Sequence, residues 1–190
     1  MSDDLRPAST GDTPPTAGDA PPGPPPGLLK TYAPLLKHWA IFLGILGVMV
    51  AINEWKVDFV NLHMATWTAS VMAWFLDVLG LDAYSNGIRV GCSICKFRII
   101  GECTAYYPLS IYIAAVMAFP SPWLRRLLGV LLGVPTLLLI NQVRLVSLCY
   151  IWKWFPDQFE TIHIVVWQSL IIFFTVLVWI GWVLTVGRRP

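Results

Sequence analysis

From residue 35 onward, long runs of apolar residues alternate with short polar stretches. The apolar runs cover residues 35–52, 104–124, 123–154 and 164–187. A helix needs about 17 to 25 such residues to cross the hydrocarbon of a bilayer, and each run is long enough to do so. The pattern therefore predicts an all-α polytopic membrane protein with about four transmembrane helices.

Residues 56–80 follow a different pattern, because polar positions recur along one side of a helix at steps of three and four. That side contains His63, Thr66, Ser70, Ala73 and Asp77, and the opposite side contains Trp67, Val71, Trp74 and Val78. Such a pattern is typical of an amphipathic helix, and we expect it to lie on the outer surface of the membrane. The alternative is that this segment crosses the membrane, with the amino terminus outside.

Two short alternating runs, residues 88–90 and 96–100, follow the pair Asn86-Gly87, which favours a tight turn. They predict a small extracytoplasmic hairpin. Cys92 and Cys95 lie between its two arms, in a Cys-x-x-Cys arrangement.

The four cysteines do not predict a disulfide framework. Cys149 falls inside an apolar run and Cys103 at the start of a helix, which leaves Cys92 and Cys95 as the close pair. A local disulfide between these two is possible on an oxidising face of the membrane.

The composition agrees with a membrane protein and excludes other classes. Of the 190 residues, 56% are hydrophobic, 13% are charged and ten are Trp. The formal net charge is +2, and the basic residues stand at the ends of apolar runs instead of forming a patch. We therefore expect membrane lipid around the protein, and no binding of nucleic acid.

The first 26 residues differ from the remainder, because they contain eight of the fifteen prolines. This composition cannot bury enough apolar surface to fold. We expect a disordered Pro-rich cytoplasmic tail at residues 1–26 and a transmembrane catalytic domain at residues 27–190. The tail lacks the features of a cleaved signal peptide, so the first apolar segment should remain as an anchor.

Three groups that hydrocarbon should exclude stand out: the thiol of Cys103, the guanidinium of Arg144 and the imidazole of His163. At about 1.5 Å per residue, Arg126 and Arg144 are separated by roughly 27 Å of helix. Cys103 and His163, counted from the basic pairs that flank the apolar runs, lie at roughly 33 Å and 37 Å. Because the hydrocarbon is about 30 Å thick, all three groups should meet at the face opposite those pairs.

Together these groups could perform acyl transfer. Cys103 at a helix start and near a guanidinium would be a stabilised thiolate and nucleophile. Arg144 could hold an oxyanion, and His163 could move a proton between the thiol and the leaving amine. Asn141 shares a helix face with Arg144 and could orient it or bind the same oxygen.

Each group also has a purely structural explanation. Cys103 could serve packing alone, and His163 could cap a helix. Arg144 could pair with a carboxylate such as Glu102 or Glu160.

The order of these residues resembles the exosortase/archaeosortase family. The resemblance covers about residues 80–185 and rests on Cys103 before one helix, the Asn141-x-x-Arg144 motif in the next, and His163 at the start of the one after that. It implies a polytopic membrane cysteine transpeptidase in which Cys103 is the nucleophile, Arg144 the transition-state stabiliser and His163 the acid/base. The chain departs from many members in having about four spans and Thr104-Ala105 after the cysteine, and its small size is similar to the short exosortase H subgroup.

The resemblance also implies a setting and a substrate. The expected location is the bacterial inner membrane, with the active site at the extracytoplasmic face. The expected substrates are exported proteins with a C-terminal sorting signal, made of a short motif, a transmembrane helix and a basic tail. No metal or other cofactor is expected.

Two other classes of protein remain open on the sequence alone. A membrane thiol-disulfide oxidoreductase would use Cys92 and Cys95 and make Arg144 incidental. A non-enzymatic assembly subunit would use the Gly129-x-x-x-Gly133 motif for dimerisation, although packing within the monomer is the favoured interpretation of that motif.

Overall fold

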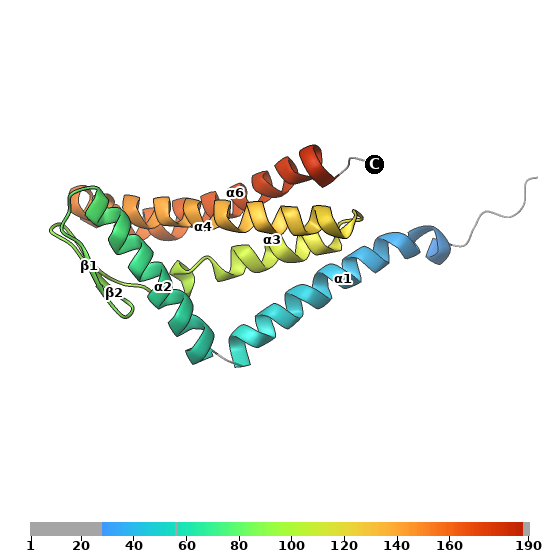
Figure 1. The fold of residues 1–190 in the computed structure, drawn as a ribbon, viewed down its shortest axis with the longest axis horizontal. Coiled ribbons are helices and arrows are strands. Elements are labelled where there is room, and N and C mark those ends of the chain that lie inside the picture. The colour runs from blue at the N-terminus through green and yellow to red at the C-terminus, as the bar shows by residue number, and fades with distance from the viewer. Residues whose placement is uncertain (1–27, 56, 188–190) are drawn as a thin grey trace, which may run out of the picture. The chain divides into compact units, whose positions relative to one another are not determined.

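The computed structural model describes residues 28–55 and 57–187, which are mainly helical (Figure 1). The helices are α1 (Leu28–Trp55), α2 (Val57–Val78), α3 (Tyr106–Ala118), α4 (Trp123–Trp154), α5 (Phe159–Thr161) and α6 (Trp167–Trp182). Shorter 3₁₀ or π-helical turns are η1 (Gly101–Cys103), η2 (Pro156–Gln158), η3 (Ile162–Val166) and η4 (Val183–Gly187). The tail expected at residues 1–26 lies outside the described residues. The chain divides into two units after Ala33, and every contact described below lies within the second.

Among the described residues, three helical segments are long and apolar enough to cross a membrane: Tyr32–Trp55, Trp123–Trp154 and Pro156–Thr185. The fourth expected span is shorter than the apolar run from 104 to 124, because α3 has only 13 residues and ends at Ala118, shortly before the Pro120-Ser121-Pro122 break. Its length is roughly 20 Å. The architecture is that of an all-α polytopic membrane protein with a small sheet.

Helices α3, α4 and α6 lie side by side (Figure 1) and share one apolar core. We call it the helical core; its buried residues are Ala105, Leu109, Tyr112, Val116, Leu137, Trp182 and Val183.

Gly129 and Gly133 of α4 lie inside the helical core. The Tyr112 hydroxyl donates to the Gly129 carbonyl at 2.8 Å, and Trp182 Nε1 donates to the Arg125 carbonyl at 3.1 Å. A Cβ atom on Gly129 would lie 2.6 Å from Trp182 Nε1, and one on Gly133 would collide with Tyr112. The prediction that this motif serves packing within the monomer is therefore confirmed.

The segment after α2 forms an antiparallel three-stranded sheet in the order β1 (Tyr84–Asn86), β2 (Arg89–Gly91), β3 (Lys96–Arg98). The predicted hairpin corresponds to β2 and β3, while β1 was not predicted. Gly87 has a φ of 59° in the two-residue turn between β1 and β2, a conformation that glycine adopts without steric cost.

Helix α2 packs against the sheet and the C-terminal half of α4, alongside β1 and β2 (Figure 1). We call this the sheet core; its buried residues are Ala65, Ala69, Met72, Ala73, Leu76, Val90, Cys95, Ile99, Cys103, Leu145 and Cys149. Ala73, expected on the polar side of α2, is only 6% exposed. The expectation of two sides was wrong at this position, because a third side of small and apolar residues faces the protein.

The other residues of the two expected sides of α2 are exposed, apart from Thr66 and Val71, which are half-buried. Trp67 and Trp74 are exposed on one, and His63, Ser70 and Asp77 on the other. Helix α2 is not among the three described segments that are long and apolar enough to span a membrane.

Candidate active site

Cys103 lies at a sharp corner of the chain between the sheet and α3. It ends η1, and the Thr104 hydroxyl closes this turn by donating to the Gly101 carbonyl at 2.7 Å. Ala105 follows with a φ of 59°, a left-handed conformation that is sterically unfavourable for a residue with a Cβ atom. Strained backbone of this kind is concentrated at functional sites, where surrounding contacts enforce it.

Helix α4 holds this corner through two buried polar side chains. Asn141 is fully buried and donates from Nδ2 to the carbonyl oxygen of Cys103 at 2.8 Å. Arg144 donates from Nη1 to the carbonyl oxygen of Glu102 at 3.5 Å. Asn141 therefore fixes the cysteine backbone through its amide nitrogen, while its Oδ1 has no hydrogen-bond partner. The expectation that Asn141 orients the guanidinium stays a prediction.

The guanidinium of Arg144 is buried without a negatively charged partner among the described residues. The side chain is 2% exposed, and its Nε has no hydrogen-bond partner. Its contact with Glu102 goes to the backbone and not to the carboxylate. The structural explanation of Arg144 as half of an ion pair with Glu102 or Glu160 is therefore not supported, and donors remain available for a bound group.

His163 belongs to η3 and is half-buried. Its ring contacts the ring of Phe159, with centroids 5.7 Å apart, and Phe159 stacks on Phe97 of β3 at 5.7 Å. Arg144 and Glu102 lie within electrostatic range of the imidazole. The aromatic contacts connect the position of His163 to the sheet, which the sequence pattern did not indicate.

Cys103 and His163 line the same cavity, whose volume is about 140 Å³. Its walls come from α2, the sheet, η1, α4 and the start of the last helical segment, through Met72, Phe97, Arg98, Ile99, Ile100, Cys103, Leu145, Leu148, Phe159 and His163. Arg144 is close enough to interact electrostatically with Cys103 as well as with His163. Cys103 and His163 thus share one largely apolar cavity, and Arg144, which does not line it, lies within electrostatic range of both.

The electrostatics of Cys103 differ from the expectation of a stabilised thiolate. Burial raises the pKa of the thiol above its ordinary value, although a backbone hydrogen bond at Ile100 and the charge of Arg144 act in the opposite direction. Desolvation outweighs the guanidinium because the thiol lies inside the protein. The resting thiol is therefore protonated at neutral pH, and a nucleophilic role requires a base.

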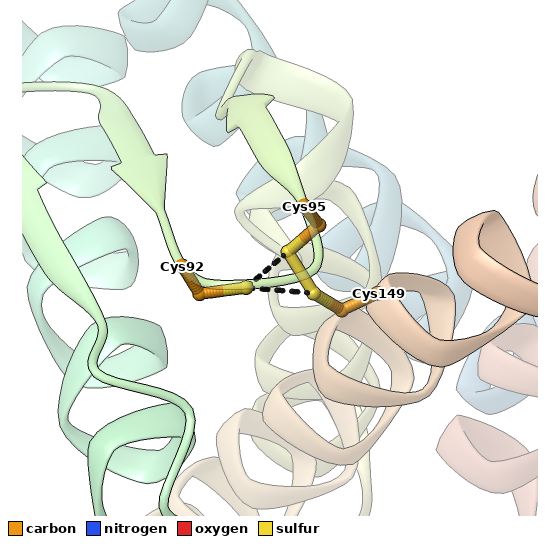
Figure 2. The surroundings of a disulfide bond; sticks show 3 residues. All are labelled: Cys92, Cys95 and Cys149. Atoms are coloured by element: carbon orange, nitrogen blue, oxygen red, sulfur yellow. Dashed lines mark hydrogen bonds between the residues drawn. A yellow bond between two sulfur atoms is a disulfide. The ribbon is translucent and has the colours of Figure 1, made fainter.

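The cysteines outside this cavity form a cluster that the sequence analysis missed. Cys95 and Cys149 are joined by a disulfide, with Cα atoms 5.8 Å apart, and Cys92 points at this bond (Figure 2). The expected local pairing of Cys92 with Cys95 is not the one present, and the exclusion of Cys149 from disulfide pairing was wrong. The two partners are 54 positions apart in the sequence. The uniformly apolar pattern of this helix did not indicate that the side carrying Cys149 faces the sheet.

The comparisons with known proteins identify the family. A family model described as transmembrane exosortase matches residues 27–186. No curated protein and no solved structure gave a match. The family model spans most of the chain, including the sheet and all the residues of the cavity. This chain therefore belongs to the family of transmembrane exosortases.

Proposed function

We propose that this protein is a membrane cysteine transpeptidase or protease that cleaves the C-terminal sorting signal of exported proteins. The site would lie at the extracytoplasmic face of the bacterial inner membrane. The observation that carries the proposal is that Cys103 and His163 line one cavity, while the unpaired guanidinium of Arg144 is within electrostatic range of both.

In the proposed mechanism, His163 accepts the proton of the Cys103 thiol as sulfur attacks the scissile carbonyl. This step is needed because burial keeps the thiol protonated. The negative charge that develops on the carbonyl oxygen is stabilised by the guanidinium donors of Arg144. His163 then donates the proton to the leaving amine, and a thioester on Cys103 remains for attack by an acceptor amine or water.

Asn141 has a positioning role in this mechanism. Its hydrogen bond to the Cys103 carbonyl holds the turn that presents the thiol. The low polarity of the cavity walls excludes water and strengthens the interaction between Arg144 and an oxyanion.

The experiment that tests the proposal is trapping of the acyl-enzyme. A peptide containing a sorting motif, a transmembrane helix and a basic tail is incubated with the full-length protein, quenched in acid and mapped by mass spectrometry. We expect a thioester on Cys103 that Cys103→Ala abolishes and that the control Cys92→Ser retains. Cleavage that persists in Cys103→Ala would rule out the proposed mechanism.

A further inference from the structure

A cluster of three sulfur atoms lies where the sheet meets α4, outside the catalytic cavity. Cys92 is free and half-buried, and its Sγ lies 2.8 Å from Sγ of Cys95 and 3.4 Å from Sγ of Cys149. Because the other two sulfurs are bonded to each other and carry no hydrogen, the thiol of Cys92 is the donor in both contacts. Figure 2 shows the side chain of Cys92, just after the end of β2, directed at the disulfide.

The turn between β2 and β3 brings Cys92 and Cys95 together. The backbone N–H of Cys92 donates to the carbonyl of Cys95 at 2.9 Å, so the two ends of the Cys-x-x-Cys segment are held close. A thiol fixed next to a disulfide is the arrangement from which thiol–disulfide exchange begins.

We propose that these three cysteines form an internal thiol–disulfide exchange site, in which Cys92 attacks Cys95 and displaces Cys149. The Cys92–Cys95 bond forms as the Cys95–Cys149 bond breaks, and the proton lost by Cys92 ends on Cys149. No electrons enter or leave, so the step needs neither an oxidant nor a reductant. The three sulfurs form a triangle in Figure 2, so the side chain of Cys92 must swing toward the axis of the disulfide before it reacts.

The exchange changes which parts of the protein are covalently joined. The Cys95–Cys149 bond fastens the sheet to α4, whereas a Cys92–Cys95 bond stays within the turn between β2 and β3. Cys95 leads through β3 to the corner at Cys103, and Cys149 lies five residues beyond Arg144 on α4. The exchange therefore removes the covalent link between the segment that carries the nucleophile and the helix that carries the arginine, and leaves the hydrogen bonds from Asn141 and Arg144 to hold them together.

A thiophilic metal ion is the competing explanation of the cluster, because the three sulfur atoms lie within 4.8 Å of one another. The disulfide occupies two of the three sulfurs, however, and the group contains no fourth ligand among the described residues. The exchange site is thus favoured, and metal binding becomes an outcome of the test.

The test maps the sulfur connectivity of the full-length protein, prepared without reductant, so its readout is independent of the proposed transpeptidase activity. The protein is held at pH 8 and quenched at acid pH. It is then unfolded in the presence of a maleimide, which alkylates free thiols, and digested for mass spectrometry. We expect two isomers: Cys95–Cys149 with Cys92 alkylated, and Cys92–Cys95 with Cys149 alkylated. In Cys92→Ser, the Cys95–Cys149 bond should be the only disulfide found. Cys149→Ser should contain the Cys92–Cys95 bond. The control Cys103→Ser should not change the ratio of the two isomers.

Several outcomes would overturn the proposal. One is a wild-type protein in which Cys149 is never alkylated, even after prolonged incubation at pH 8. Another is three alkylated thiols in the unreduced protein, with or without an equivalent of bound zinc measured by elemental analysis. A Cys92–Cys149 bond as the second isomer would overturn the assignment of Cys95 as the attacked sulfur.

Discussion

The two halves of α4 carry two cores that are held together in different ways. In the helical core, Gly129 and Gly133 allow Trp182 and Tyr112 to approach the backbone and donate to it. In the sheet core, a disulfide fastens the sheet to α4 across a sequence separation of 54. Close packing in the helical core requires two positions on α4 without a side chain, whereas the sheet core is held by a covalent bond.

The residues proposed for catalysis lie where these cores meet. Asn141 and Arg144 follow the glycine-containing half of α4 and precede Cys149. Cys103 belongs to the sheet core, and Ala105, two residues later, belongs to the helical core. The comparison teaches that the site can be disturbed from either side, and that each disturbance should be local.

Removing the disulfide should loosen the sheet core alone. The double variant Cys95→Ser, Cys149→Ser should lose about 4 kcal/mol of stability, as expected for a cross-link over this sequence separation. Hydrogen exchange should accelerate in β2 and β3 and stay unchanged in α3 and α6. Cys92→Ser is the matched control because it keeps the bond. Equal acceleration in α3 and α6 would mean that the two cores unfold as one.

Arg144→Lys should impair the proposed cleavage about 100-fold to 1000-fold, because an ammonium does not reproduce the planar set of guanidinium donors at an oxyanion. Thermal stability should change little by comparison. The measurement is kcat/KM on a sorting-signal peptide, with Arg89→Lys in the exposed part of the sheet as the control. A lysine variant with normal turnover would show that positive charge alone is sufficient.

Gly133→Ala should destabilise the helical core by about 1 to 3 kcal/mol, because the added Cβ collides with Tyr112 in a packed interior. Gly44→Ala is the matched control: it is also a glycine inside a helix, and a Cβ there meets nothing within 4 Å. Denaturation in mixed detergent micelles measures both. If the two variants were equally stable, the close approach of Tyr112 would not matter.

The raised pKa of Cys103 predicts slow alkylation at neutral pH. The thiolate fraction should continue to rise at pH values above 9.0, the ordinary pKa of a cysteine thiol, because burial disfavours the charged form. Removing the positive charge with Arg144→Gln should move the profile to still higher pH, since the guanidinium favours the thiolate. The rate of labelling by a small neutral reagent, followed by peptide mapping, reports both. A profile centred below that of an ordinary cysteine would contradict the dominance of burial.

Ala105→Gly should stabilise the protein by up to about 1 kcal/mol, because glycine adopts the left-handed conformation at this position without steric cost. Thermal denaturation measures the effect, and Ala118→Gly at the regular end of α3 should instead be destabilising.

The sequence predicted the features that depend on local pattern and composition. The apolar runs gave the helices, and the order of Cys103, Asn141, Arg144 and His163 gave the family. The helical depth count also placed the three polar groups together, since rise per residue is nearly constant.

What the sequence did not predict depends on contacts between distant segments. The Cys95–Cys149 bond and the Phe97–Phe159–His163 contacts join residues whose proximity no periodicity reports. The net effect on the Cys103 pKa required the depth of burial, which competes with the charge of Arg144. The buried third side of α2 was missed because alanine carries little hydrophobic signal at Ala65, Ala69 and Ala73.

Helix α4 is continuous over 32 residues, including Pro135, and a helix of that length measures roughly 48 Å. The hydrocarbon of a typical bilayer is about 30 Å thick, so one end of α4 must project from it or the helix must tilt. Arg144 lies roughly 27 Å from Arg126 along this helix, and in the proposed orientation it would stand at the boundary between acyl chains and headgroups. With the site at that depth, hydrophobic mismatch would set part of its hydration: a thicker membrane would draw the guanidinium toward the acyl chains, and a thinner one would leave it among the headgroups.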